Sequence, residues 1–164
     1  MIQIREVRTD SPVAVALLRE YVADRVATRP TAAGGYRAPQ PDPALFLPPR
    51  GMFVVGAEGD EVLGCAGIRS IVPGLEWVDD GFGGSHWFEL KHLFTRPEAR
   101  GRGVARRLLE HLPIAAREFG GDRLVLDTHS ALAAATGLYA RAGFREVPRF
   151  NDNSNADRWY GKEL

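Results

Sequence analysis

Apolar and polar positions follow regular periods over most of the chain, and these periods predict its secondary structure. Strands are indicated where apolar residues alternate with polar ones, as at Ile2 and Ile4, or form short uninterrupted runs. Seven such stretches lie at residues 1–7, 52–58, 61–72, 86–95, 123–128, 144–147 and 158–164. Gly59-Asp60 separates the second from the third and predicts a hairpin turn.

Apolar spacings of three and four residues predict helices at 12–28, 104–119 and 132–142. The first helix begins at Pro12, and Asp10 or Ser11 can cap it. The third ends at Gly143, a residue type that commonly terminates helices. Pro113 falls inside the second helix, and we expect it to kink or end that helix, because proline lacks an N–H and clashes with the preceding turn.

The fourth predicted strand is apolar on both faces and is therefore expected in the middle of a sheet. Strict alternation assigns Phe88, Leu90 and Phe94 to one face and Trp87 and Leu93 to the other. The order of elements along the chain is strand, helix, three strands, helix, strand, helix and two strands.

Two irregular stretches interrupt this order. Residues 29–51 hold six of the 11 prolines, with a short helix expected at 43–47, and residues 73–85 are rich in glycine and aspartate. Long irregular connections in compact domains usually have a function. Because specificity commonly lies on such loops, we expect them to contact a substrate. Candidate lining residues are Tyr36, Phe46, Trp77, Asp79 and Asp80, each of which could equally be a loop anchor or a solvated charge.

Composition narrows the classes of protein that the chain can represent. Its 164 residues, 45% of them apolar, suit one domain over 1–164. Equal numbers of basic and acidic residues, 21 each, argue against a nucleic-acid binder. Cys65 is the single cysteine, in an apolar strand, which predicts a core thiol, and the histidines have no metal-ligand spacing. No apolar run approaches a membrane span and no signal pattern is present, so we expect a cytoplasmic protein.

The most informative segment follows the fourth strand. The run Arg100-Gly101-Arg102-Gly103-Val104-Ala105 forms a basic turn at the start of a helix. A helix N-terminus carries unpaired N–H groups and partial positive charge, and glycine lets an anion approach the backbone. The turn lacks the third glycine of the Rossmann fingerprint, and the P-loop lysine and hydroxyl are absent too. Taken alone, it could equally be a basic surface turn.

A second motif, Gly137-Leu138-Tyr139-Ala140-Arg141-Ala142-Gly143-Phe144, lies downstream. The glycine turn resembles the Arg/Gln-x-x-Gly-x-Gly/Ala signature of the GNAT family of N-acetyltransferases, and the second motif resembles that family's Leu-Tyr-x-x-x-Gly-Phe. The closing run 151–159 is similar to a tail found in some of these enzymes. The resemblance implies the acyl-CoA N-acyltransferase fold. This is a mixed α/β architecture with a central, mostly antiparallel sheet of about seven strands flanked by helices.

The resemblance also implies acetyl-CoA as co-substrate. Its diphosphate would bind at the turn of Arg100, Gly101, Arg102, Gly103, Val104 and Ala105. The backbone of Leu93, Phe94 and Thr95 would hold the pantetheine arm, and an N–H near Phe94 would face the thioester oxygen. The family needs no metal.

Tyr139 is the expected general acid, a role that the family gives to a tyrosine at this position. An ordinary phenol is protonated at neutral pH. The alternative is that Tyr139 only packs under the sheet and positions the sulfur. Glu89 is the expected base or ammonium anchor, because a carboxylate in an apolar strand is costly to bury without a task. A structural pair with Lys91 is the alternative for Glu89, and Asp127 and His129 are further candidates for the base.

The sequence favours a small-molecule amine or amino acid as acceptor, without identifying it. Neither a nucleic acid nor a membrane is an expected partner, and a homodimer is compatible with this interpretation. Two alternatives remain. One is a non-catalytic acyl-CoA-binding or regulatory domain, which would need neither Tyr139 nor Glu89. The other is a protein N-terminal or lysine acetyltransferase, which would need an open peptide groove.

Overall fold

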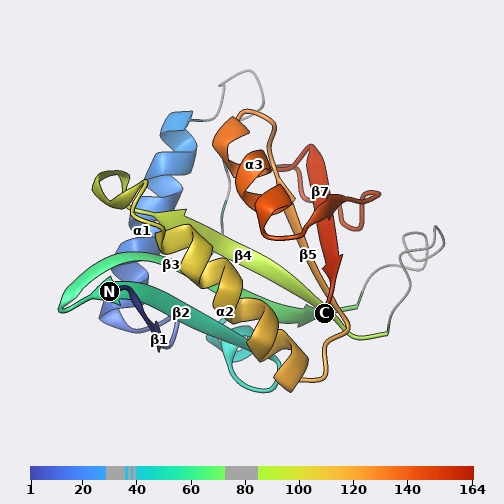
Figure 1. Cartoon of the computed structure of the whole chain (residues 1–164), viewed down its shortest axis with the longest axis horizontal. Helices are drawn as coiled ribbons and strands as arrows, with labels where there is room; N and C mark the ends of the chain where they lie inside the picture. The colour runs from blue at the N-terminus through green and yellow to red at the C-terminus, as the bar shows by residue number, and fades with distance from the viewer. Residues whose placement is uncertain (29–35, 37, 39, 73–84) are drawn as a thin grey trace.

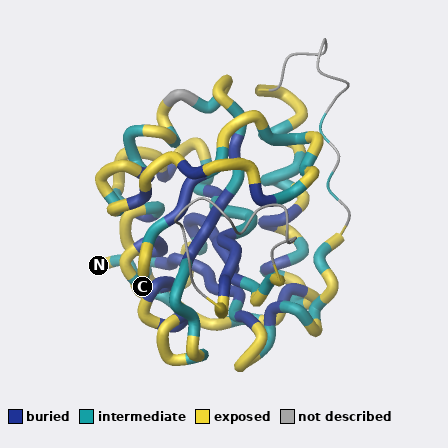
Figure 2. Tube along the Cα trace, turned by 90° about the vertical axis from the view of Figure 1, so that its right-hand side faces the viewer, coloured by how far each residue is buried: buried dark blue, intermediate teal, exposed yellow. Residues whose placement is uncertain are grey.

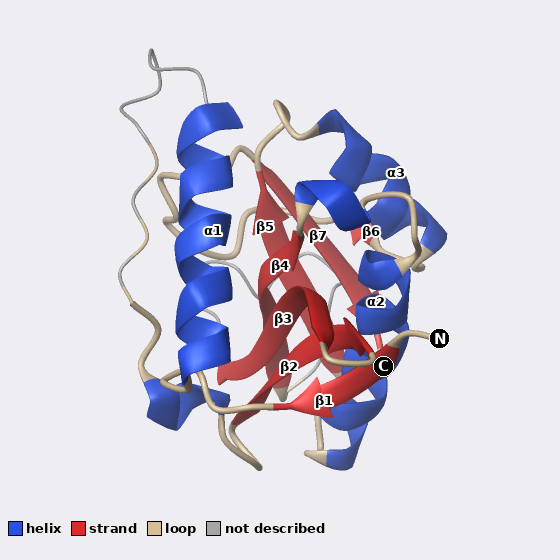
Figure 3. Ribbon diagram, turned by 90° about the vertical axis from the view of Figure 1, so that its left-hand side faces the viewer, coloured by secondary structure: helices blue, strands red, loops and turns tan. Residues whose placement is uncertain are grey.

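A computed structural model describes residues 1–28, 36, 38, 40–72 and 85–164. Within these residues, one sheet crosses the molecule with helices on both faces (Figures 1 and 3). Its strands are β1 (Gln3–Glu6), β2 (Gly51–Glu58), β3 (Glu61–Ile71), β4 (Trp87–Thr95), β5 (Arg123–Thr128), β6 (Arg145–Glu146) and β7 (Arg158–Glu163). Its helices are α1 (Pro12–Thr28), α2 (Val104–Glu118) and α3 (Ala133–Arg141), with short 3-10 turns η2 (Pro43–Phe46) and η4 (Pro97–Ala99).

The strand order is β1-β2-β3-β4-β5-β7-β6. Neighbouring strands run antiparallel except β4 and β5, which are parallel because α2 crosses over between them. The mixed, mostly antiparallel seven-stranded sheet expected from the sequence is confirmed. So are the predicted strands and helices, each boundary within two residues of expectation.

The two faces of the sheet bury separate apolar clusters. On one face, Leu17 and Leu18 of α1 pack against Phe53 of β2. On the other, α2 packs Leu108 and Leu112 against the strands. Figure 2 shows the buried residues concentrated in the central strands, between these two layers. The side-chain alternation of a pleated strand produces this division, because successive residues point to opposite faces.

Helix α2 runs through Pro113 and continues to Glu118, so of the two expected outcomes, a kink or an end of the helix, the end does not occur. Leu112 and Ala116, on either side of Pro113, are fully buried. Burying a large apolar side chain contributes about 1.5–3 kcal/mol, so the packed second half of α2 offsets the roughly 3 kcal/mol that an interior proline costs. Gly120, with φ of 85°, follows the helix end in a left-handed conformation.

A β-bulge in β4 overturns the predicted faces of that strand. Cys65 pairs with Phe94 and Gly67 with Lys91, so Ala66 of β3 opposes two residues of β4. His92, the first of those two, has a left-handed φ of 57°. The extra residue reverses the alternation beyond it. Phe94 therefore joins the cluster under α1, and Leu93 packs on the α2 face with Phe88 and Leu90.

Strands β4 and β5 pair only at their first residues and then separate. The paired positions are Trp87 with Arg123, Phe88 with Leu124 and Glu89 with Val125. From Leu90 onward β4 has no ladder partner on this side within the described residues. The two strands diverge toward α3 (Figure 1). This separation opens the middle of the sheet and sets the position of the candidate site.

Candidate active site

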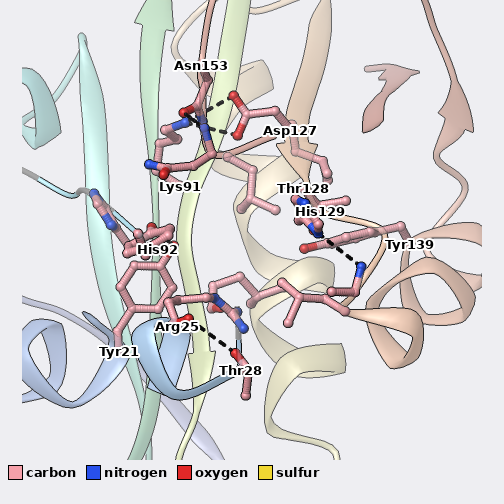
Figure 4. A pocket seen from close by; sticks show the side chains of 17 residues that line it. Tyr21, Arg25, Thr28, Lys91, His92, Asp127, Thr128, His129, Tyr139 and Asn153 are labelled. Carbon is pink, nitrogen blue, oxygen red and sulfur yellow. Dashed lines mark hydrogen bonds and ion pairs between the residues drawn. The ribbon is translucent and has the colours of Figure 1, made fainter. Parts of the chain in front are cut away.

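A cavity of about 90 Å³ lies where β4 and β5 separate. Figure 4 shows its side chains, which come from α1, β4, β5, α3 and the C-terminal segment. The described lining residues are Tyr21, Arg25, Thr28, Tyr36, Leu90, Lys91, His92, Leu93, Leu126, Asp127, Thr128, His129, Ala131, Leu132, Tyr139, Asn153 and Asn155. Tyr139, Leu93 and the candidate bases Asp127 and His129 are thus brought together, although nearly 50 residues separate the first two.

Tyr139 reaches the cavity wall from α3 and is 7% exposed. Its ring packs against Tyr160, with centroids 5.9 Å apart, and against Phe144 at 6.0 Å. Gly143, with φ of 83°, ends α3 and turns Phe144 back under the helix. Burial raises the pKa of Tyr139, so its hydroxyl is protonated at neutral pH. The side chain is both packed and placed to donate a proton into the cavity.

Glu89 is buried beneath the cavity, with 2% of its side chain exposed. Its Oε2 accepts from Arg69 Nε at 2.9 Å and lies 2.8 Å from Arg69 Nη2, while Oε1 is 2.9 Å from Lys91 Nζ. The pair with Lys91 that the sequence left open as an alternative is therefore present. Glu89 is not among the described lining residues, whereas Lys91 is. A role for Glu89 as base stays a prediction.

Lys91 links Glu89 to Asp127 of β5. Its Nζ lies 3.3 Å from Asp127 Oδ1, and the Asp127 side chain is 6% exposed. Asn151 completes the cluster, since its Nδ2 donates to Asp127 Oδ2 at 2.7 Å. Burial alone lowers the pKa of Lys91, but Glu89 and Asp127 outweigh it and the net pKa is raised. Lys91 is therefore cationic and cannot serve as a base.

Sequence reasoning missed the structural roles of two residues of the site, His92 and Arg25. His92 sits at the bulge, where burial first, and then Lys91 and Arg69, lower its pKa to about 4. Its Nδ1 is buried with no hydrogen-bond partner in the described chain. The sequence contains no signal for the bulge. Arg25 follows Tyr21 by four residues on α1, and that spacing, which places both on one helix face, could have revealed it.

The C-terminal segment closes one side of the cavity with amide side chains. Asn153 and Asn155 line it, and Asn151 is held by Trp159, whose Nε1 donates to Asn151 Oδ1 at 3.0 Å. Of the loop residues proposed to line an acceptor site, Tyr36 does so, and its hydroxyl is 2.6 Å from that of Tyr21. Phe46 is instead buried in the core, with 2% exposure. The remaining three, Trp77, Asp79 and Asp80, lie outside the described residues.

A groove of about 750 Å³ runs along the glycine turn, between α2 and α3. The first helical bond of α2 joins Arg107 N–H to Gly103 C=O at 3.1 Å, so the preceding N–H groups have no intrahelical acceptor. Gly101 and Gly103 have φ of 80° and 85°, and a Cβ at either would meet nothing within 4 Å. The glycines are therefore required by a left-handed backbone, and the space beside them is open to a ligand.

Most of the predicted turn residues face this groove. Arg100, Gly101, Gly103, Val104 and Ala105 line it, together with Thr95. Arg102 points instead to Glu58, with Nη2 to Oε2 at 2.7 Å. Arg100 is paired with Asp24 of α1 at 2.6 Å. The side chain of Phe94 lies in the core, so only its backbone could contact a ligand.

The described part of the chain shows neither a membrane-spanning helix nor a group of metal-binding side chains. None of its helices combines the length and apolar character needed to cross a bilayer. No group of three or more histidine, cysteine, aspartate or glutamate side chains there could hold a metal ion.

Comparisons with known proteins identify relatives of the chain. The chain is 34% identical over 94 residues to an IAA acetyltransferase of Azospirillum brasilense, covering 57% of this chain and 54% of that protein. It is 30% identical over 143 residues to the uncharacterized N-acetyltransferase YjgM of Escherichia coli, covering 84% and 78% of the two chains. The chain thus spans about half the length of the Azospirillum brasilense protein and 78% of the length of YjgM.

The fold is shared with solved structures as well. An acetyltransferase of the GNAT family from Staphylococcus aureus superposes with a TM-score of 0.72 at 20% identity, covering 100% of this chain and 99% of that one. At this identity the likeness concerns the fold alone. The acetyltransferase (GNAT) family model matches residues 14–144, which include the bulged β4, the glycine turn and Tyr139. The chain therefore belongs to the acetyltransferase (GNAT) family.

Proposed function

We propose that this protein transfers an acetyl group from acetyl-CoA to the primary amine of a small molecule. The observation that carries the proposal is the continuity of β4. Its Leu93 lines the cavity beside Tyr139, while its Thr95 lines the groove of the glycine turn. One short segment of backbone thus joins a site suited to an anion with a site that holds a buried phenol.

The groove has the charge that acetyl-CoA requires. Five basic side chains and a single carboxylate are among its described lining residues: Arg100, Arg106, Arg117, Arg141, Lys162 and Glu110. The outward N–H groups at the start of α2 add to this positive field. The residues of the turn, 100–105, would hold the diphosphate, and the unpaired edge of β4 at Leu93, Phe94 and Thr95 would hold the pantetheine arm.

Acetyl-CoA would supply the acetyl group as a thioester. In our proposal a backbone N–H near Phe94 donates to the thioester oxygen, where negative charge develops. The new N–C bond forms as the C–S bond breaks, and Tyr139 Oη gives its proton to the departing sulfur. The raised pKa keeps that proton available across the neutral range. The phenol is regenerated from solvent, and the amine loses its own proton to a base.

We propose that the acidic groups around Lys91 serve the amine. Glu89 would act as base or ammonium anchor only through its neighbours, because Arg69 and Lys91 hold its two oxygens. Asp127 and His129 line the cavity directly and could accept the proton at shorter range. The expectations of a cytoplasmic location and a homodimer stay predictions.

A thiol-release assay with acetyl-CoA and a panel of primary amines, amino acids and short peptides tests the proposal. Release of CoA that depends on a small amine would support it. Tight binding of acetyl-CoA without turnover of any acceptor would favour the non-catalytic binding domain. Turnover restricted to peptides would favour a protein N-terminal or lysine acetyltransferase.

A further inference from the structure

Among the described residues that line the cavity, Arg25 has a guanidinium whose donors are mostly unused. From its position we propose that the acceptor is an amino acid and that Arg25 binds its carboxylate. This assignment rests on the transferase function proposed above, since it names the acceptor class for the same cavity.

Arg25 lies in the last turn of α1 and lines the cavity with 21% of its side chain exposed. Its Nη2 donates one long hydrogen bond, of 3.4 Å, to the carbonyl of Leu93. Its guanidinium carbon sits 5.1 Å from the ring centroid of Tyr21. A guanidinium carries five N–H donors in a planar fork. Within the described chain these contacts leave most of the fork open, which is costly for a largely buried charge unless an anion completes it.

The other charges around the cavity are already balanced. Lys91 is shared by Glu89 and Asp127, at 2.9 and 3.3 Å. His92 is neutral at physiological pH, because burial lowers its pKa to about 4. Asp24, the carboxylate beside Arg25, lies 3.6 Å from Arg25 Nη1 but 2.6 Å from Arg100. Arg25 is thus the lining cation with the weakest counterion, and a bound carboxylate would balance it.

The location of Arg25 fits a bifunctional acceptor. Its fork touches Leu93, at the start of the segment proposed to hold the thioester. A carboxylate on Arg25 therefore brings an amine a few bonds away to the reacting carbonyl, between β4 and Tyr139. The cavity has about 90 Å³, where a single water needs about 10–15 Å³ by the same measure, so it has room for a small ligand beside Arg25.

The experiment compares matched acceptors that differ only in charge. Glycine, alanine, leucine and phenylalanine are assayed beside their primary amides, each at saturating acetyl-CoA, and kcat/KM is measured. We expect the wild-type protein to prefer the acid by at least tenfold for one pair or more. Arg25→Gln should reduce this preference by about ten- to a hundredfold, mainly through KM, as expected for the loss of a charge-assisted hydrogen-bonded pair.

Two further variants define the specificity of the effect. Arg25→Lys keeps the charge without the fork and should retain part of the preference. Arg19→Gln removes an exposed arginine from the same helix and should leave the preference intact. Equal turnover of acids and amides by the wild type, or a preference that survives Arg25→Gln, would overturn the inference while leaving the proposed function standing.

A binding measurement covers the case in which no acceptor in the panel turns over. Calorimetry with CoA-loaded protein compares N-acetylglycine and N-acetylalanine with the corresponding amides. Tighter binding of the acids, lost in Arg25→Gln and kept in Arg19→Gln, would support the carboxylate site even if the transferase proposal failed. No difference between acids and amides would overturn the inference by itself.

Discussion

The groove at the glycine turn and the cavity between β4 and β5 are adjacent but built in different ways. The turn side of the groove is backbone from one continuous segment, 97–105, with left-handed glycines and the N–H groups of α2. The cavity is built of side chains from several helices, strands and loops that are distant in the sequence, held by aromatic packing and a buried ion cluster. A ligand recognised by backbone can be shared across a family, whereas a site assembled from distant side chains can change its specificity by single substitutions.

The largest expected effect is on the groove. Gly103→Glu should abolish acetyl-CoA binding in calorimetry, because it places bulk and negative charge in the open space at the start of α2. A side chain at φ of 85° also costs roughly 1–2 kcal/mol in strain. Gly59→Glu is the matched control, because Gly59 has φ of 59° and equally open surroundings in the β2–β3 turn. Ordinary affinity in the Gly103 variant would remove the diphosphate assignment.

The next effect should fall on the cavity alone. Tyr139→Phe should slow turnover by a factor on the order of 100 or more, the usual contribution of a general acid, with unchanged affinity for acetyl-CoA. Tyr160→Phe provides the control, since Tyr160 packs against the Tyr139 ring, with centroids 5.9 Å apart, without being among the described lining residues. If Tyr139→Phe and Tyr160→Phe have the same kcat, Tyr139 is a packing residue.

A third prediction concerns His92, a lining residue of the cavity, and how the free energy of unfolding depends on pH. The folded pKa of His92, about 4, lies below its ordinary value of 6.5. Between these values the unfolded chain binds more protons, so His92 lowers the stability of the folded state as pH falls from about 6.5 to about 4. The loss is on the order of 3 kcal/mol. It is measured as the difference in urea unfolding free energy between pH 7 and pH 4.

His92→Asn serves as the comparison, because asparagine does not titrate and tolerates a positive φ. Other groups titrate equally in both proteins, so the difference between them isolates His92. The variant should lose less stability on acidification than the wild type. Parallel pH profiles for the two proteins would show that His92 is not held neutral by burial.

The smallest effect should appear where α1 meets the groove. Asp24→Asn releases Arg100 from its 2.6 Å ion pair. Because an exposed pair contributes about 0.2–1 kcal/mol, acetyl-CoA affinity should rise by no more than about fivefold, and less at high salt. Asp60→Asn, in the β2–β3 turn, is the control for lost surface charge. A weaker affinity in Asp24→Asn would mean that Asp24 supports the cofactor side and does not compete with it.

Local patterns predicted most of the fold, and each failure has a physical cause. The amphipathic stripe located α2 correctly, but the helix does not end at Pro113, because tertiary burial outweighs one lost hydrogen bond. Alternation placed β4 in the middle of the sheet, but it misassigned the faces of Leu93 and Phe94 because a single inserted residue reverses the pattern. The sequence around His92 contains no pattern that predicts the β-bulge in β4.

In the candidate site, too, some features depend on contiguous residues and others on long-range packing. The glycine turn and the position of Tyr139 on α3 were readable from the chain, because both depend on contiguous residues whose backbone conformation is set locally. Long-range packing places Glu89 between Arg69 and Lys91, and it turns Arg25 toward the cavity with few donors used within the described residues. Those relations depend on where β4 and β5 separate and on how α1 crosses the sheet. Both follow from long-range packing, which no local spacing encodes.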